Sequence, residues 1–263
     1  MKTKGREQRL KEKYLRPESI AVPTCPGCGH GILRGLILRV ISDLKLDEGD
    51  NLLMVGGIGC AASYISTIFK VDTIHTLHGR AIAFATGAKV FNPKLTVMVI
   101  GGDGDIGDIG GNHLIHAARR NMDLTVILAN NGLYGMTGGQ VACSTPFGLK
   151  TTTTAQGNPY RPFHFPKLMK AAGAAYAARF SVTQPFQLME GIQKALQVQG
   201  FSFLEVLTTC PTQYGRRNEM GTPEEMFAYL MGRCISKEDA RALSPEELKD
   251  RFILGELEDD PAG

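Results

Sequence analysis

The feature that most constrains the fold is a pair of polar tips, each placed at the end of an apolar run. Leu95 to Ile100 is apolar and β-branched, and it leads into Gly102-Asp103-Gly104. A second apolar run, Leu124 to Leu128, leads into Asn130-Asn131, and 25 residues separate Gly104 from Asn130. The residues from Gly110 to Arg120 read as a crossover helix, so the two runs are predicted to be parallel strands. Both tips then lie at one edge of the sheet, where open α/β sheets bind ligands.

The chemistry of these tips suits a cation together with a phosphate. The Asp103 carboxylate and the Asn131 amide oxygen are ligands for an octahedral Mg²⁺ that also holds phosphate oxygens. The neighbouring glycines allow backbone N–H groups to approach the phosphates closely. The spacing resembles the thiamine diphosphate motif, which implies that Asp103, Asn131 and the carbonyl of Leu133 bind Mg²⁺. A glycine-rich strand-to-helix turn followed by an unrelated Asn-Gly turn is the alternative.

The cysteines indicate a second cofactor. There are six of them, Cys25, Cys28, Cys60, Cys143, Cys210 and Cys234. Cys25-Pro-Gly-Cys28 lies on a Pro/Gly loop, and Cys60 and Cys210 each follow a strand-like run. Four thiolates placed in this way could enclose a [4Fe–4S] cluster. A Cys₄ zinc site, a redox-active C-x-x-C pair and inert buried thiols remain open alternatives.

In combination, these motifs resemble the β subunit of the 2-oxoacid:ferredoxin oxidoreductases. The matching segments occur in order: Cys25-Pro-Gly-Cys28-Gly-His30, Ile58-Gly59-Cys60, His78-Gly79-Arg80, GGDGD at 101–105, NNGLYGMTGGQ at 130–140, and Cys210-Pro-Thr. The resemblance implies that Cys25, Cys28, Cys60 and Cys210 bind one [4Fe–4S] cluster beside the thiazolium ring. It leaves Cys143 and Cys234 without a role.

The resemblance also places the thiamine diphosphate on the loops of these motifs. The residues expected to contact it are Ile58, Gly59, Cys60, Ala61, His78, Gly102, Gly104, Asp105, Asn131, Tyr134, Gly135 and Met136. His30 and His78 are the candidate catalytic residues, although each is alternatively an ordinary loop or core histidine. His113 and His116, three residues apart on the crossover helix, are better explained as core or surface residues.

The activity implied is oxidative decarboxylation of a 2-oxo acid to an acyl-CoA, with electrons passed through the cluster to ferredoxin in a reversible reaction. An α subunit carries the pyrimidine-binding domain, so this chain is expected to be active only in an αβ or (αβ)₂ assembly.

The segments Tyr134–Gln140, 151–154 and Tyr214–Asn218 look most like β subunits acting on 2-oxoglutarate, which yields succinyl-CoA and CO₂. The cation for the second carboxylate is expected from Arg216, Arg217 or a residue of the α subunit; a surface or interface ion pair is the alternative for the two arginines. Pyruvate or a branched-chain 2-oxo acid is the alternative substrate. A non-catalytic metal-thiolate module is the alternative of a different class.

Composition and patterning agree with an α/β fold, a mostly parallel sheet with helices on both faces. We predict a basic N-terminal arm at 1–22 that packs on another subunit, a cofactor-binding domain at 23–215 and a helical extension at 216–263 with an acidic, disordered end. Residues 133–163 are expected to form one long loop.

The net charge of +3 favours no polyanionic partner such as nucleic acid, and no stretch is apolar enough to suggest a membrane span. Free thiols without a secretion signal favour the cytoplasm.

Overall fold

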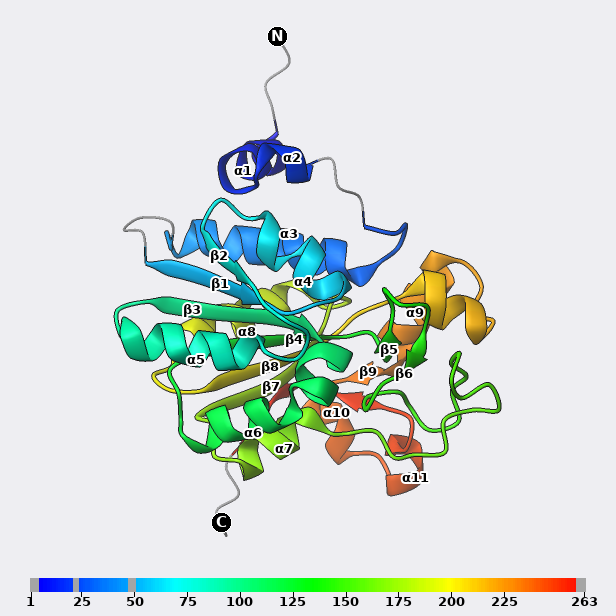
Figure 1. The fold of residues 1–263 in the computed structure, drawn as a ribbon. Helices are drawn as coiled ribbons and strands as arrows, with labels where there is room; N and C mark the ends of the chain where they lie inside the picture. The colour runs from blue at the N-terminus through cyan, green and yellow to red at the C-terminus, as the bar shows by residue number, and fades with distance from the viewer. Residues whose placement is uncertain (1–4, 21–23, 47–50, 259–263) are drawn as a thin grey trace.

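The computed structural model describes residues 5–20, 24–46 and 51–258, and these ranges are built around a seven-stranded sheet (Figure 1). The strand order is β11-β7-β8-β4-β3-β1-β2. The strands are β1 Leu52–Gly56, β2 Asp72–His75, β3 Thr96–Gly102, β4 Thr125–Asn130, β7 Tyr176–Ser181, β8 Ser202–Leu207 and β11 Gly255–Glu256. Each described neighbour pair is parallel except β11 with β7. The predicted α/β class with a mostly parallel sheet is therefore confirmed.

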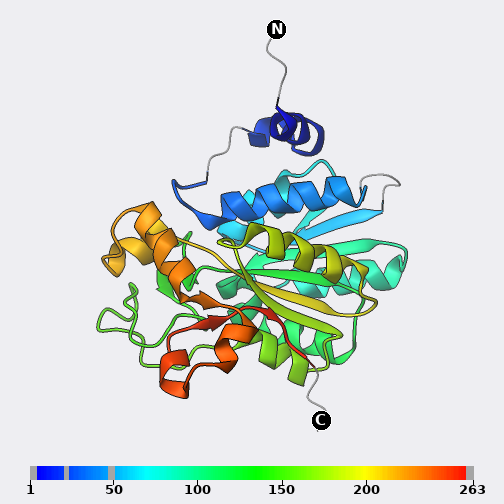
Figure 2. The same ribbon diagram turned by 180° about the vertical axis from the view of Figure 1, so that it is seen from behind.

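Helices cover both faces of the sheet, and each face has its own apolar core (Figures 1 and 2). One face carries α1 Arg6–Tyr14, α3 Gly29–Asp43, α4 Cys60–Tyr64 and α8 Pro185–Gln197, and the other carries α5 Ala81–Phe91, α6 Gly111–Arg119 and α7 Phe165–Ala171. Alternate residues of a strand point to opposite faces. Met98 and Ile100 of β3 therefore pack in the first core, and Val97 and Val99 pack in the second. Burial on both faces explains why the central strands are continuous apolar runs.

The chain order reverses between β1 and β3, which are neighbours in the sheet. From β1 the chain moves outward to β2 at the edge, and then returns to place β3 on the other side of β1. The helix after β1, α4, packs on one face, whereas α6, after β3, packs on the other. The two loops therefore diverge and leave a crevice at the carboxyl ends of the strands, which is where such sheets bind ligands.

The helical extension after residue 215 lies beside this edge (Figure 1). Its helices are α9 Pro223–Arg233, α10 Lys237–Arg241 and α11 Pro245–Leu248. Helix α9 starts with a capping box, in which Thr222 Oγ1 accepts from the Glu225 N–H while the Glu225 carboxylate accepts from the Thr222 N–H. Each of these bonds satisfies a backbone donor that the first helical turn leaves without an intrahelical partner.

Two expectations about the ends of the chain need revision. The described part of the N-terminal arm packs on its own chain, because Tyr14 and Leu15 are buried in the first core and the Lys70 N–H donates to the Tyr14 carbonyl at 2.7 Å. A contact between the arm and another subunit stays a prediction. Glu256, expected in a disordered end, instead pairs with Ala178 in the sheet. Residues 259–263 lie outside the described residues.

The expectation of a single long loop at 133–163 is also wrong in part. This segment contains a short hairpin, β5 Leu133–Tyr134 paired with β6 Gln140–Val141. Strands of two residues carry too little alternation to be recognised from sequence. The hairpin projects beyond the carboxyl ends of the central strands (Figure 1). The division into parts 1–22, 23–215 and 216–263 remains a prediction. Among the residues that the structure describes, none of the helices has the length and apolar character that crossing a bilayer requires.

Candidate functional site

A pocket lies in the crevice at the carboxyl ends of β1, β3 and β4, and we call it the strand-end pocket. Its empty volume is about 450 Å³, part of it open to solvent. It is lined by His30, Ile58, Gly59, Cys60, Ala61, His78, Gly102, Asp103, Gly104, Asp105, Asn131, Leu133, Tyr134, Gly135, Met136 and Thr137. Every residue that the sequence led us to expect at the thiamine cofactor or its Mg²⁺ lies in this lining. Thr137 is the addition.

Three oxygen-bearing groups converge at one end of this pocket. One terminal atom of the Asn131 amide lies 3.2 Å from Asp103 Oδ1 and 2.7 Å from the Leu133 carbonyl oxygen. As the amide nitrogen this atom would donate to both oxygens; as the amide oxygen it accepts from the Leu133 N–H at 3.3 Å and faces the two other oxygens, an arrangement that a bound cation would stabilise. Neighbouring ligands of an octahedral Mg²⁺ lie about 2.9 Å apart, since each is about 2.0–2.1 Å from the ion. The donor set and its spacing therefore fit Mg²⁺.

The burial of Asp103 supports the same interpretation. Its side chain is 2% exposed, and the Ser144 hydroxyl donates to Oδ2. Burial raises the pKa of Asp103 to about 7, and the Ser144 hydrogen bond only partly offsets this effect. A buried carboxylate is costly to ionise without a compensating charge. A bound divalent cation would provide that charge.

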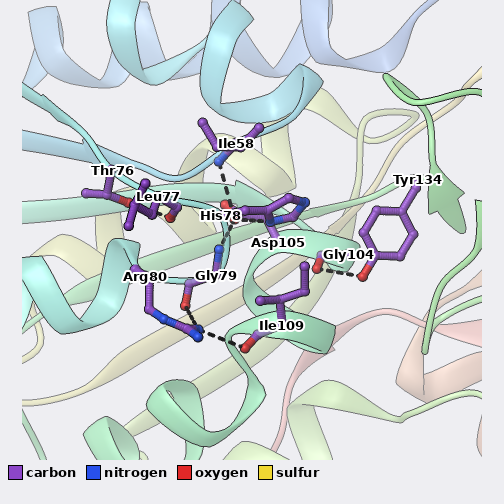
Figure 3. Close-up of polar contacts among 10 residues, drawn as sticks. All are labelled: Ile58, Thr76, Leu77, His78, Gly79, Arg80, Gly104, Asp105, Ile109 and Tyr134. Atoms are coloured by element: carbon purple, nitrogen blue, oxygen red, sulfur yellow. Dashed lines mark hydrogen bonds and ion pairs between the residues drawn. The ribbon is translucent and has the colours of Figure 1, made fainter.

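Asp105 has a different task from Asp103, because it ties two loops and a histidine together (Figure 3). Its Oδ1 accepts from the Gly79 N–H at 2.7 Å, from His78 Nδ1 at 2.9 Å and from the Ile58 N–H at 3.3 Å. Burial raises the pKa of Asp105, and these donors oppose the rise. As a hydrogen-bond acceptor the carboxylate selects the His78 tautomer with a proton on Nδ1. Nε2 of His78 is then available to a bound molecule.

The hairpin approaches the glycine-rich turn after β3 very closely. Tyr134 Oη donates to the Gly104 carbonyl at 3.0 Å, and the Tyr134 ring packs against the His78 ring with centroids 5.9 Å apart. A Cβ added at residue 104 would lie 2.5 Å from the Tyr134 ring. Gly132, which leads into the hairpin, has φ of +78°, a conformation that favours glycine.

A second pocket, which we call the cysteine pocket, adjoins the first. Its empty volume is about 400 Å³, part of it open to solvent. The lining is Cys25, Cys28, His30, Cys60, Tyr64, Asn131, Gly135, Cys210, Pro211, Thr212 and Gln213. The structure thus brings together the four cysteines predicted to bind the cluster. The strand-end pocket and the cysteine pocket share His30, Cys60, Asn131 and Gly135.

Backbone N–H groups point at three of the four thiols. The N–H of His30 lowers the pKa of Cys28, the N–H of Cys60 lowers that of its own thiol, and those of Gln213 and Tyr214 lower that of Cys210. Cys28 is the N-cap of α3, Cys60 opens α4, and Cys210 is the N-cap of the turn Pro211–Gly215. Such positions favour a thiolate over a thiol.

Burial raises the pKa values of these thiols, and as long as no cation is bound this effect is larger than that of the N–H groups. It raises the pKa of Cys28 to about 12 and that of Cys60 to about 11. Among the described residues, no group of three or more His, Cys, Asp or Glu side chains is close enough to hold a single metal ion. Four thiols around one pocket are the donor set of a [4Fe–4S] cluster or of a Cys₄ zinc site.

His30 is buried in the wall between the two pockets. Its side chain is 1% exposed, and burial lowers its pKa to about 4, so the ring is neutral at physiological pH. Neither ring nitrogen has a hydrogen-bond partner in the described part of the chain. A buried polar atom of this kind calls for an explanation.

Other sequence candidates lie away from both pockets. Arg217 Nη2 donates to the Gly138 carbonyl and to Gln213 Oε1, so this arginine supports the hairpin loop. Neither Arg216 nor Arg217 lines either pocket. Cys143 packs at the edge of the second core, where burial and the Asp108 carboxylate raise the pKa of its thiol. Cys234 opens the short strand β9 Cys234–Ile235. His113 and His116 lie on α6, as expected.

The residues that hold Asp103 and Asn130 in place were not predicted from the sequence. Ser144 was not recognised as the partner of Asp103. Asn130 donates through Nδ2 to Glu205 Oε1 at 2.7 Å, and Glu205 Oε2 accepts from Arg179 Nε at 2.7 Å. A signal was present, because Glu205 and Arg179 are charged residues inside otherwise apolar strands. Charges at such positions are rarely buried unless they are paired.

Comparison with known proteins agrees with this geometry. The family described as thiamine pyrophosphate enzyme, C-terminal TPP binding domain, matches residues 57–206. The 2-oxoglutarate synthase subunit KorB of Methanothermobacter marburgensis is 46% identical over 249 residues, which cover 95% of this chain and 87% of that protein. The protein of the same name from Archaeoglobus fulgidus is 50% identical over 199 residues, which cover 76% of this chain and 73% of that protein.

A solved structure extends the comparison to three dimensions. It is the 2-oxoglutarate:ferredoxin oxidoreductase from Magnetococcus marinus with 2-oxoglutarate, coenzyme A and succinyl-CoA bound. It matches with a TM-score of 0.80 and 30% identity, over 96% of this chain and 85% of that chain. The fold is thus that of a thiamine diphosphate enzyme. More narrowly, the chain belongs to the β subunits of the 2-oxoacid:ferredoxin oxidoreductases.

Proposed function

We propose that the chain, together with an α subunit, oxidatively decarboxylates 2-oxoglutarate. In this reaction 2-oxoglutarate and coenzyme A give succinyl-CoA, CO₂ and a proton, and two electrons pass through a [4Fe–4S] cluster to ferredoxin, reversibly. The observation that carries the proposal is the wall shared by the strand-end and cysteine pockets, made of His30, Cys60, Asn131 and Gly135. Electrons released in one pocket then have only a short distance to travel to the other. The names of the relatives support 2-oxoglutarate as the substrate.

We assign the diphosphate end of the cofactor to the strand-end pocket. Asp103 Oδ1, the Asn131 amide oxygen and the Leu133 carbonyl would hold Mg²⁺, and Gly102 and Gly104 let the backbone come close to the phosphates. When bound, thiamine diphosphate supplies the electron sink that allows a 2-oxo acid to lose CO₂. The Tyr134–Gly104 contact keeps the turn in place beside the hairpin.

His78 is the candidate for proton handling in this pocket. Asp105 holds its Nδ1 at 2.9 Å, which orients Nε2 toward a bound substrate. The ring is also fixed by its contact with Tyr134. A histidine oriented by a buried carboxylate is a common arrangement for general acid–base work.

We assign Cys25, Cys28, Cys60 and Cys210 to one [4Fe–4S] cluster. The backbone N–H groups at Cys28, Cys60 and Cys210 support thiolates, and the cationic iron would offset the burial that raises the pKa values of these thiols. Cys143 and Cys234 lie outside the cysteine pocket and receive no role in the cluster.

The lining explains why a partner chain is required. Thiamine enzymes need a carboxylate at the aminopyrimidine ring to form the reactive carbanion. Asp103 and Asp105 are the only acidic residues in the described lining, and both are already engaged. We therefore assign this carboxylate to the α subunit, in an αβ or (αβ)₂ assembly. The cation for the second carboxylate of 2-oxoglutarate is assigned there too, because neither Arg216 nor Arg217 lines the pocket.

Steady-state kinetics of the assembled complex test the proposal. With coenzyme A and ferredoxin, kcat/KM should be highest for 2-oxoglutarate, compared with pyruvate and 2-oxoisovalerate. The chain without its α subunit is the control and should form no succinyl-CoA. A higher kcat/KM on either of the other acids would overturn the substrate while leaving the reaction class. A complex without reducible iron would overturn the electron path.

A further inference from the structure

His30 is the buried polar side chain of the site whose hydrogen bonds are missing. It lies at the second position of α3, directly after the cysteine loop, and lines both pockets. Both ring nitrogens lack a partner. The other side-chain atoms that are buried without a partner in the described residues belong to Asp105, Ser202 and Arg217, none of which lines the cysteine pocket.

A neutral imidazole carries one N–H, and in a buried position that N–H needs an acceptor. The residues that the structure describes offer none, so we assign the acceptor to a group bound in one of the two pockets. In the strand-end pocket the strongest acceptors would be the diphosphate oxygens, at the end marked by Asp103, Asn131 and Leu133. Under the proposed function, Mg²⁺ would already serve that end.

The cysteine pocket presents a different demand. A cluster held by four thiolates is rich in sulfur acceptors, and the backbone N–H groups near Cys28, Cys60 and Cys210 act on the thiols of these residues. His30 follows Cys28 by two residues, and its backbone N–H lies close enough to the Cys28 thiol to oppose the rise in the pKa of that thiol. Its side chain adds a donor on the wall that faces the thiamine cofactor.

We propose that the His30 side chain donates a hydrogen bond to a sulfur of the [4Fe–4S] cluster and thereby raises the reduction potential of the cluster. This inference rests on the proposed function, because it requires the cluster to be present. The physical reason is that reduction adds negative charge to the cluster, and a hydrogen bond to sulfur stabilises the reduced form more than the oxidised form. The residue therefore makes the cluster a better acceptor for electrons leaving the neighbouring pocket.

The test is a potentiometric titration of the cluster in the assembled α/β complex, followed by electron paramagnetic resonance. The variant His30→Phe keeps a ring but removes the donor, and His30→Gln keeps an N–H donor. His116→Phe, on the exposed side of α6, is the matched control. Iron and thiamine diphosphate contents are measured in every sample.

We expect His30→Phe to lower the equilibrium constant for cluster reduction about tenfold, which is about 59 mV for a one-electron couple. His30→Gln should recover most of this shift, and His116→Phe should cause none. The inference is overturned if His30→Phe retains full iron content with an unchanged potential, or if only thiamine diphosphate affinity changes. If Phe prevents cluster loading, His30→Leu and His30→Gln decide the question, since equal potentials in these two variants would also overturn it. Absence of a cluster in the unmodified complex would instead refute the proposed function.

Discussion

The buried ion pair between Arg179 and Glu205 allows a quantitative prediction about how the motif is supported. The two side chains are only 8% and 1% exposed, so solvent screens their interaction little. Glu205 also accepts from Asn130, the first asparagine of the motif. Replacing Glu205 by Gln keeps the size of the side chain but leaves the Arg179 charge buried and unpaired. Removing one partner of a buried pair costs about 3–5 kcal/mol.

The double variant Arg179→Met/Glu205→Met should be less damaging than either single Met variant, although it changes more atoms. Once both charges are gone, the remaining loss is the unsatisfied Asn130 Nδ2, which costs about 1–3 kcal/mol. Urea unfolding of each variant gives the free energies, provided that the slope against urea concentration stays constant. Lys194→Met is the matched control, because the Lys194–Glu256 pair is exposed and should be worth less than about 1 kcal/mol. A double cost equal to the sum of the two single costs would refute this account of coupling.

Three further predictions concern the site. Burial raises the pKa of Asp103 to about 7, above that of an ordinary carboxyl, so protons compete with Mg²⁺ for this side chain. We therefore expect the Mg²⁺-dependent affinity for thiamine diphosphate to fall about tenfold per pH unit below about pH 7, as measured by calorimetry. An affinity that does not change with pH would contradict this prediction. Cys210→Ser should lose cluster iron in anaerobic iron and sulfide assays, whereas Cys234→Ser keeps it, and the reverse result would end the cysteine assignment. Gly104→Ala should abolish cofactor binding with the circular dichroism spectrum unchanged, since its Cβ would lie 2.5 Å from the Tyr134 ring; normal affinity would show that the turn can move.

The sequence predicted the sheet and its ligand edge because those features have local causes. Each central strand is a continuous apolar run, and each motif residue directly follows such a run. Asp103 ends up beside Asn131 simply because β3 and β4 are neighbours in register, with Gly102 opposite Ala129. The ends of two strands and the pairing of these strands are enough to bring the two side chains together.

The features that escaped prediction depend on contacts between distant segments. Nothing near Ser144 indicates that its hydroxyl reaches Asp103, 41 residues earlier in the chain. The Glu205–Asn130 bond likewise joins residues 75 apart. The packing of the arm on its own chain was not predicted, because Tyr14 and Leu15 are apolar residues among charges, and their burial depends on the assembled first core and on the segment at 68–70. Tertiary packing decides such cases, and local pattern does not.

The shared wall between the two pockets leads to a last prediction, that cluster and thiamine cofactor stabilise each other's binding. Cys60 supplies its thiol to the cysteine pocket, while its neighbours Ile58 and Gly59 line only the strand-end pocket. Cluster binding should therefore fix the loop that the cofactor contacts. Coupling free energies of this kind are typically about 1–3 kcal/mol, or about 5–150-fold in affinity, and must be reciprocal. We expect thiamine diphosphate to bind the cluster-loaded complex at least about fivefold more tightly than the cluster-free Cys25→Ser complex, because Cys25 lines only the cysteine pocket. Equal affinities measured by calorimetry would show that cluster binding and cofactor binding are not coupled, although the two pockets share a wall.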